Sequence, residues 1–415
     1  SITLTASEYA LHYAFDAGAQ DPFVILEYAT PAEKGWMMLY SADGHFEGDV
    51  SLAYSGAGGK TSVALTSART TGSIGKASTT LPKAADYQKP TGKSNVKVTD
   101  FVLTETPEGF HYAFNAIGTD YMLLYWRSKE QTVTQPVYPD ENGHYEGDVI
   151  SNLTFARTQF TVQVKSGSGS MKKEATVRKG YQAPEAPQRQ EGRLSGVTVC
   201  IDAGHQENGR FVNEPIGPGL SGSTSGKGGM AQGTKTNRRE SIVCLEIGML
   251  LRDELLRQGA NVIMTREDQT TFHTNIERCE IAEAGGAQIM LRLHCNNSSN
   301  RSKRGIQVYG PLNSDYAKAV ADADTYREMG QKLLDAMKTR VGMTLANSTG
   351  MVRLNDNYVG NNWAKMMCFL VEMGYLSNPA EEYLLVTPVY QQWLAEGMAD
   401  GVYEIAVARG WVQAQ

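Results

Sequence analysis

The stretch Val197-Thr-Val-Cys-Ile-Asp-Ala-Gly-His-Gln206 decides how the C-terminal half of this chain folds. Five β-prone residues run into Asp202, then into a small-residue turn and His205. A run of this kind predicts a buried strand in a mostly parallel sheet. Open α/β sheets bind ligands at the carboxyl ends of their strands, so His205 is placed to bind one. An ordinary turn residue or a packed core histidine would fit the same pattern.

Three further segments look like strands with polar residues at the same end. Residues 287–294 end in His294, residues 366–372 end in Glu372, and residues 261–266 end in a polar turn. The carboxyl ends of parallel strands meet at one edge of a sheet, so these side chains should converge there. Two histidines with two or more carboxylates are the composition of a zinc site that keeps an open position.

Composition limits the classes of protein to consider. The chain has 415 residues, of which 41% are hydrophobic and 20% charged, and this length predicts roughly three domains. The net charge of −6 argues against nucleic acid as a partner, because phosphate binding favours a basic face. No apolar run approaches the ~18 residues of a membrane helix. The sequence begins at Ser1 without a signal peptide, as a processed secreted protein or a trimmed chain would.

The five cysteines all lie in the C-terminal half, and none forms a Cys-x-x-Cys pair. Their odd number and their places in predicted strands and helices favour free, mostly buried thiols. Cys295 adjoins His294, so a metal role is the alternative for it alone.

Residues 1–180 contain an internal repeat. His12-Tyr-Ala-Phe15 recurs as His111-Tyr-Ala-Phe114, and Gly44-His-Phe-Glu-Gly-Asp-Val50 recurs as Gly143-His-Tyr-Glu-Gly-Asp-Val149, with the same offset. Short segments rich in Val, Thr, Tyr and Phe alternate with turn residues, which predicts two small all-β sandwich-like repeats, at 1–85 and 94–180. The joint between them lies around 81–94.

Two groups of side chains in the repeats could either stabilise the fold or bind a ligand. Structural roles are favoured over metal binding for the four histidines in the repeated motifs, which are His12, His45, His111 and His144. Stacking on sugar rings of the cell wall or plain packing would fit the prominent aromatic residues, which are Trp36, Tyr40, Trp126 and Tyr138.

Residues 181–193 contain prolines and no apolar periodicity, which predicts a linker. Over 194–415 the sequence pattern changes and predicts alternating strands and helices. A Gly-rich loop follows the first strand over 206–236, and a loop of this length is usually functional or mobile. A helix over 239–257 then carries Glu240 in its first turn. The helix dipole alone favours a carboxylate there; the alternative is that Glu240 is a metal ligand directed from the start of the helix toward the strand ends. Competing carboxylates are Glu207, Glu214 and Glu246.

Further along the chain, we expect helices at 275–283, 315–341 and 390–407, and a strand at 305–309. The segment 342–363, rich in Asn and Gly, reads as a loop.

An ordered set of motifs over about 195–410 resembles the zinc-dependent N-acetylmuramoyl-L-alanine amidases of the Amidase_3 family. The set comprises Ile201-Asp-Ala-Gly-His205, Glu240 at the start of a helix, Thr265-Arg-Glu-Asp268, His294-Cys-Asn296 and Glu372-Met-Gly-Tyr-Leu-Ser-Asn378. Ala203, Gln206 and Tyr375 depart from the usual Pro, Gly and Phe of the family, and none of these changes removes a ligand.

The resemblance implies a mostly parallel α/β domain with one Zn²⁺ held by His205, Glu240 and His294. It also implies that Glu372 acts as general base and then acid, with a fourth metal ligand or a salt-bridge partner as the alternative. Asp202 and Asn296 would orient the ligands.

The implied reaction is hydrolysis of the amide between the lactyl group of N-acetylmuramic acid and L-alanine of the stem peptide. The implied partner is peptidoglycan, through both its glycan and its stem peptide, and the implied location is extracellular, at the cell wall. Two alternatives remain, a zinc peptidase that cuts within the stem peptide and an inactive wall-binding protein.

Overall fold

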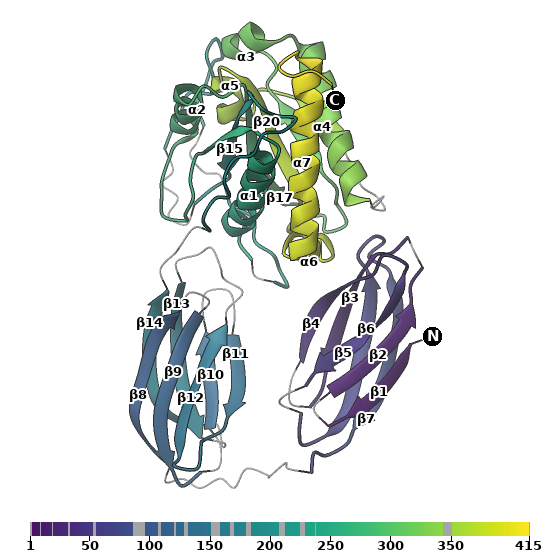
Figure 1. Cartoon of the computed structure of the whole chain (residues 1–415), viewed down its shortest axis with the longest axis vertical. Coiled ribbons are helices and arrows are strands. Elements are labelled where there is room, and N and C mark those ends of the chain that lie inside the picture. Colours follow the sequence, from purple (N-terminus) through teal and green to yellow (C-terminus); the bar gives the residue numbers. More distant parts are fainter. Residues whose placement is uncertain are drawn as a thin grey trace. The chain divides into compact units, whose positions relative to one another are not determined.

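The chain folds into two compact units, Ser1–Gln182 and Ala183–Gln415 (Figure 1). The computed structural model describes residues 2–8, 10–18, 20–31, 34–52, 55–85, 96–106, 109–119, 122–127, 132–150, 158–166, 170–179, 184–206, 212–224, 229–236, 238–342 and 351–414. Among these residues no helix is both long and apolar enough to cross a membrane.

The N-terminal unit consists of small antiparallel sheets, as predicted. The first half contains the sheets β1-β2-β5 and β4-β3-β6-β7. Their strands are β1 (Thr3–Ser7), β2 (Ala10–Asp16), β3 (Phe23–Ala29), β4 (Lys34–Tyr40), β5 (His45–Ser51), β6 (Gly59–Ser67) and β7 (Ser73–Leu81). The second half contains the sheets β12-β9-β8 and β11-β10-β13-β14. Their strands are β8 (Lys97–Thr106), β9 (Gly109–Ile117), β10 (Met122–Arg127), β11 (Thr132–Val137), β12 (His144–Ile150), β13 (Thr158–Ser166) and β14 (Met171–Lys179).

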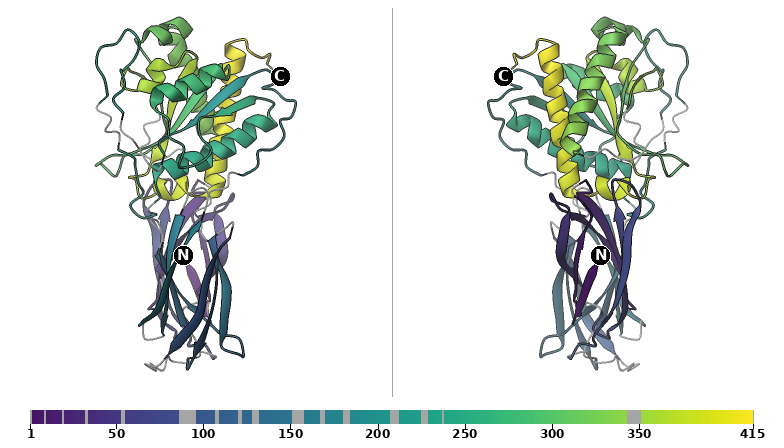
Figure 2. Two further views of the ribbon diagram at one scale, coloured as in Figure 1. Left: turned by 90° about the vertical axis from the view of Figure 1, so that its left-hand side faces the viewer. Right: turned by 90° about the vertical axis from the view of Figure 1, so that its right-hand side faces the viewer.

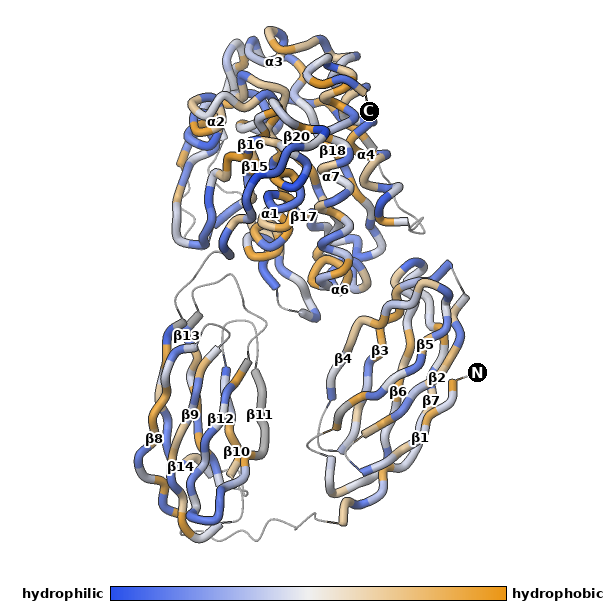
Figure 3. Tube along the Cα trace, in the orientation of Figure 1, coloured by the Kyte–Doolittle hydropathy of each residue, from blue (hydrophilic) through white to orange (hydrophobic). Residues whose placement is uncertain are grey.

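Alternation of side chains along these strands forms the cores of the N-terminal unit. In β2, Leu11, Tyr13 and Phe15 are buried and the residues between them are not. They share a core with Leu26 of β3 and Leu65 of β6, so the two sheets pack face to face. The same alternation is visible as changing hydropathy along the strands in Figure 3.

One of the four prominent aromatic residues, Trp126, takes the packing role that the sequence left open. Trp126 is 3% exposed and packs edge-on against Phe110 and Phe160, so it belongs to the core and is not a sugar-stacking surface residue. The sequence motif around it, Tyr121-Met-Leu-Leu-Tyr-Trp126, does not reveal which alternate face is buried. Residues 86–94 of the expected joint lie outside the described residues.

The C-terminal unit contains a six-stranded mixed sheet in the order β16-β15-β17-β20-β18-β19. Its strands are β15 (Thr198–Ala203), β16 (Asn261–Met264), β17 (Ile289–Asn296), β18 (Gln307–Gly310), β19 (Met351–Leu354) and β20 (Met367–Tyr375). The four strands β16, β15, β17 and β20 are parallel, whereas β18 pairs antiparallel with β20. The carboxyl ends of the four parallel strands therefore meet at one edge, as the sequence predicts.

Helices cover both faces of this sheet (Figures 1 and 2). On one face α1, α4 and α7 pack together, and on the other α2 and α5 pack over Cys200, Met290 and Cys368. The helices are α1 (Glu240–Arg257), α2 (Asn275–Ala284), α3 (Asp315–Val320), α4 (Ala323–Val341), α5 (Val359–Trp363), α6 (Glu381–Leu385) and α7 (Pro388–Ala408).

Two expectations for this unit are wrong. The single helix expected over 315–341 is broken, because Ala321 is extended and the Asp322 side chain accepts from the Thr325 N–H to start α4. The loop expected over 342–363 contains β19 and α5. Both elements are short, and their few residues carry no periodic signal of their own.

Candidate active site

The strand ends deliver the predicted residues to one place. His205 follows β15, His294 lies near the end of β17, and Glu372 lies opposite His294 on β20. Glu240 is the first residue of α1, whose amino end points at this edge of the sheet. His205 adopts a left-handed backbone conformation with φ 58°, which turns its ring back toward the other groups.

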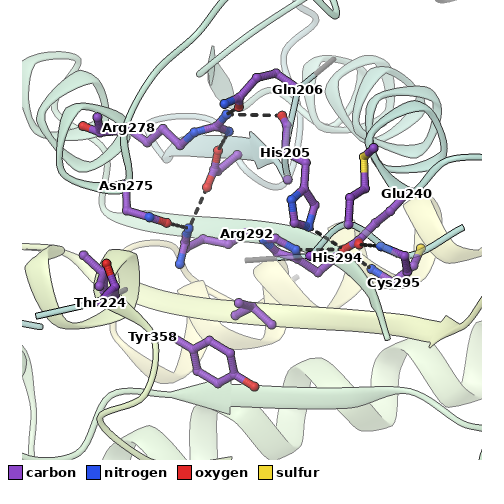
Figure 4. Close-up of a pocket in the computed structure, with 18 of the residues that line it drawn as sticks. His205, Gln206, Thr224, Glu240, Asn275, Arg278, Arg292, His294, Cys295 and Tyr358 are labelled. Carbon is purple, nitrogen blue, oxygen red and sulfur yellow. Dashed lines mark hydrogen bonds and ion pairs between the residues drawn. The ribbon is translucent and has the colours of Figure 1, made fainter. Parts of the chain in front are cut away.

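Three side chains form a compact group with the composition of a metal site. The ligand atoms of His205, Glu240 and His294 all lie within 4.8 Å of one another. His205 Nε2 and His294 Nδ1 are each 3.0 Å from the same oxygen, Glu240 Oε1. Figure 4 shows the three side chains turned toward one another from separate elements. Two imidazole nitrogens and one carboxylate oxygen are the ligand set of many catalytic zinc sites.

The protonation states also suit a metal ion. Burial opposes the charge of Glu240, but its hydrogen bonds with His205 and His294 outweigh burial and hold the pKa of this carboxyl below its usual range. Burial is also the main reason why the pKa of His294 is lowered. An ionised carboxylate and a neutral imidazole are the forms that bind a cation. The three converging donors and their protonation therefore fit a zinc ion.

Backbone amides fix the Glu240 carboxylate. The Cys295 N–H donates to Oε1 at 3.0 Å, and the Ala231 N–H donates to Oε2 at 2.7 Å. Ala231 belongs to the Gly-rich loop, so the end of that loop is tied to α1. The Cys295 thiol itself is buried, and burial raises its pKa well above the usual range. All five cysteines are free and buried, as predicted.

Glu372 lies beside this group with an unsatisfied oxygen. Its Oε2 is buried without a hydrogen-bond partner among the described residues. Burial, and then the negative charge of Glu240, raise the pKa of Glu372 to about 8. A carboxyl group with raised proton affinity next to an ionised one is the pattern of a general acid–base residue.

Asp202 and Asn296 make other contacts than those expected of residues that orient the ligands. Asp202 is fully buried and binds Arg278, Arg292 at 3.0 Å and the Thr265 hydroxyl at 2.8 Å. Burial opposes its charge, but the two guanidinium groups outweigh burial and hold the pKa of Asp202 far below its usual range. The Asn296 amide donates to Gln307 at 3.1 Å. In the described part of the chain, neither side chain makes a hydrogen bond or ion pair with a histidine ring.

Arg266 positions the turn that carries His205, a role that the sequence alone did not indicate. Its guanidinium donates to the carbonyls of Ala203, Gly204 and Ser241 at 2.7 to 2.8 Å. It thereby ties the turn that carries His205 to the first turn of α1. The Thr265-Arg266 motif pointed to this residue, but only the fold shows which carbonyls it reaches.

Two of the other carboxylates considered as metal ligands, Glu214 and Glu246, form hydrogen bonds and ion pairs with other groups. Glu214 accepts from the backbone N–H groups of Asn275 and Ile276 at the amino end of α2, at 3.2 and 2.8 Å. Glu246 binds Arg238 and Gln391. Glu207 lies outside the described residues. Among the described candidates, only Glu240 joins the histidines.

The group lies in a cavity of about 890 Å³. Besides the three candidate ligands and Glu372, its wall includes Gln206, Glu214, Thr224, Gly229, His273, Asn275, Arg278, Arg292, Asn297 and Tyr358. A second, polar cavity of about 510 Å³ shares Asn296 and Asn297 with it. The first cavity, which contains the candidate metal ligands, is large enough to hold a drug-sized ligand.

The four histidines of the N-terminal unit contact acidic or amide side chains. His12 and His45 both face Glu47, at 3.3 and 3.7 Å. His111 and His144 both face Glu146, at 3.2 and 3.7 Å. Within the described segments of the N-terminal unit, they do not form a compact metal group of the kind found at Glu240.

Comparisons with known proteins match the C-terminal unit to one family. Residues 199–404 match the family model of N-acetylmuramoyl-L-alanine amidase, Amidase_3. The germination-specific N-acetylmuramoyl-L-alanine amidase of Bacillus subtilis is 26% identical over 231 residues, which cover 52% of this chain and 83% of that protein. The probable cell wall amidase LytH of Staphylococcus aureus is 27% identical over 218 residues, which cover 52% of this chain and 60% of that protein.

One of the solved structures that the chain matches is an N-acetylmuramoyl-L-alanine amidase from Clostridium difficile 630. It is 23% identical with a TM-score of 0.40, and the match covers 51% of this chain and 96% of that one. Through residues 199–404, the chain belongs to the Amidase_3 family of N-acetylmuramoyl-L-alanine amidases.

Proposed function

We propose that this protein is a zinc-dependent N-acetylmuramoyl-L-alanine amidase that acts on bacterial peptidoglycan. It hydrolyses the amide that joins the lactyl group of N-acetylmuramic acid to L-alanine of the stem peptide. The observation that carries the proposal is the convergence of His205 Nε2, His294 Nδ1 and Glu240 Oε1 in one cavity of an Amidase_3 domain.

His205, Glu240 and His294 hold one Zn²⁺ ion in this proposal. Bound zinc supplies a Lewis acid that polarises a carbonyl and lowers the pKa of water from 15.7 to about 7. The amides of Cys295 and Ala231 keep the Glu240 carboxylate in place for this purpose, and Arg266 fixes the turn that carries His205. These contacts restrict the ligands before substrate arrives.

Glu372 moves the protons. Glu372 lines the cavity, and its Oε2 has no hydrogen-bond partner among the described residues. Its high proton affinity suits a group that accepts a proton from the attacking water. The same carboxyl then delivers this proton to the alanine nitrogen as the C–N bond breaks. The products are a glycan with a free lactyl carboxyl group and a stem peptide with a free amino terminus.

Digestion of purified peptidoglycan followed by mass spectrometry tests this reaction. We expect released stem peptides that begin with L-alanine, and glycan strands that carry free lactyl groups. Cuts between amino acids of the stem would instead identify a zinc peptidase. Binding to the wall without any cleavage product would identify an inactive wall-binding protein.

The N-terminal unit serves in this proposal as a pair of wall-binding modules, at 1–85 and 94–180, joined through a linker at 181–193 to a catalytic domain at 194–415. The repeated sequence motifs and the separation of the chain into two units support this division. Three aromatic side chains are exposed and suit contact with wall carbohydrate, namely Trp36, Tyr40 and Tyr138. A secreted protein that works in the cell wall fits this arrangement.

A further inference from the structure

A buried arginine in the active-site cavity has one guanidinium nitrogen that makes no hydrogen bond to the described residues. Arg292 is 4% exposed, and its Nε donates to Asp202 at 3.0 Å while its Nη2 donates to Asn275 at 2.7 Å. Its Nη1 has no hydrogen-bond partner in the described part of the chain. Arg292 lines the same cavity as the candidate metal ligands, and Figure 4 shows its guanidinium beside Asn275.

The neighbouring arginine differs in this respect. Arg278 donates from Nε to the His273 carbonyl, from Nη1 to Asp202 and the Ala203 carbonyl, and from Nη2 to Gln206 and the His205 carbonyl. All three of its nitrogens are therefore used to hold the fold together. Arg292 alone of the pair keeps a charged donor for a ligand.

The local charges leave Arg292 able to attract an anion. A single carboxylate, Asp202, is shared between two guanidinium groups. Another carboxylate in the cavity wall, that of Glu214, is linked to Arg292 through Asn275. Its charge is compensated by backbone N–H groups at the amino end of α2. A buried guanidinium with a free donor favours a planar, charged acceptor such as a carboxylate.

The spacing of residues along β17 suggests which carboxylate Arg292 binds. Arg292 and His294 are two residues apart on one strand, so both project from the same face about 6.6 Å apart. An extended peptide advances at most about 3.3–3.6 Å per residue. If a stem peptide runs extended along β17 toward Arg292, a carboxyl group two residues beyond a carbonyl held at His294 comes level with Arg292, at most about 7 Å away.

We propose that Arg292 is a specificity-determining residue that binds a free α-carboxylate on the second residue of the stem peptide. This inference rests on the proposed amidase function, because it places the scissile carbonyl beside His294. An enzyme with this contact distinguishes stem peptides whose second residue is glutamate from those in which the same carboxyl is amidated.

Two matched substrates test the inference on the intact enzyme. One is N-acetylmuramoyl-L-alanyl-γ-D-glutamyl-L-lysine, and the other carries a carboxamide in place of the glutamyl α-carboxylate. We expect kcat/KM to be about 10- to 100-fold higher for the free acid, the range that a charge-assisted hydrogen bond supplies. Equal rates, or faster cleavage of the amide, would overturn the role of Arg292 while leaving the amidase function intact.

Arg292→Gln should remove this preference, and Arg292→Lys should keep part of it because the charge remains without the planar fork. Arg327→Gln, on the exposed surface of α4, should leave it unchanged. Calorimetric binding of the product peptide L-alanyl-γ-D-glutamyl-L-lysine and of its amide gives a readout that does not depend on turnover. Tighter binding of the free acid by the wild type but not by Arg292→Gln supports the proposal, and an undiminished preference in that variant refutes it.

If Arg292→Gln does not fold, the substrate preference and product binding of the wild type still decide the matter. Failure of the proposed function gives a different result, in which neither substrate is cut at the lactyl–alanine bond.

Discussion

At the scale of single residues, the site separates two carboxyl groups by their surroundings. Glu240 is surrounded by donors and stays ionised, whereas burial beside Glu240 raises the pKa of Glu372 to about 8. One carboxyl is therefore suited to hold a cation and the other to carry a proton. Their different roles follow from which polar groups each one meets.

Glu372→Gln tests the proton-transfer role with little change in shape. We expect zinc content to stay at the wild-type value and kcat to fall by ~10²–10⁴-fold, the usual contribution of a general base or acid. Metal analysis of the purified variant combined with a turnover assay provides both readouts. Turnover close to that of the wild type would exclude Glu372 from the reaction.

His294→Ala tests the ligand set. We expect loss of bound zinc, because only two of the three converging ligand atoms remain. His273→Ala is a matched control, since His273 lines the same cavity but lies outside the group of three. Full zinc occupancy in His294→Ala, or equal loss in both variants, would show that the ligands are chosen wrongly.

At the scale of elements, the turn after β15 has to pass very close to β17. The Gly204 N–H donates to the Leu293 carbonyl at 2.9 Å, and a Cβ at position 204 would lie 2.4 Å from that oxygen and 2.6 Å from the His294 ring. Only glycine permits this approach. The small residue in the motif Asp-Ala-Gly-His is thus a requirement of packing between two neighbouring strands.

Gly204→Ala should therefore weaken zinc binding and lower the midpoint of thermal unfolding. Gly229→Ala is the control, because a Cβ there meets nothing within 4 Å although Gly229 lines the same cavity. Zinc titration and thermal melts of the two variants give the comparison. If Gly204→Ala behaves like Gly229→Ala, the close approach of the strands has no energetic importance.

Asp202 joins β15 to β17 and α2 through the two arginines. Asp202→Asn should lower the free energy of unfolding at pH 7 by about 3–5 kcal/mol, because two buried guanidinium groups lose their counter-charge. The pKa of Asp202 is depressed in the folded state, so its contribution is fully present above its ordinary pKa near 4 and is lost as the pH falls below it.

Denaturant unfolding at pH 7 and at successively lower pH measures this dependence. The difference in stability between wild type and Asp202→Asn should shrink below pH ~4. A difference that stays constant with pH would mean that the charge of Asp202 does not stabilise the fold.

Much of the C-terminal unit can be predicted from sequence because its long elements carry strong periodic signals. The β15 strand, the α1 helix and the strands that end at His294 and Glu372 appear where expected. The break before α4 and the short elements β19 and α5 escape prediction, since the four residues of β19 and the five of α5 do not define a period. Contacts across the fold, such as the pairing of Asp202 with Arg278 and Arg292, depend on which strands lie side by side.

At the scale of the whole molecule, the division into two compact units predicts separable activities. A fragment of residues 184–415 should keep zinc binding and cleave soluble muramoyl peptides at the wild-type rate. It should bind insoluble cell walls more weakly than the full chain if the N-terminal unit is the anchor. Sedimentation with purified walls measures the second property, and equal retention of fragment and full chain would argue against wall-binding modules.

The most direct test of the account is an anomalous diffraction map of crystals of the full chain, measured at the zinc absorption edge. The account predicts one peak per chain, with His205 Nε2, His294 Nδ1 and Glu240 Oε1 each about 2.0–2.2 Å from it. Zinc bound at a different place in a zinc-loaded, catalytically active crystal, away from these three atoms, would contradict it.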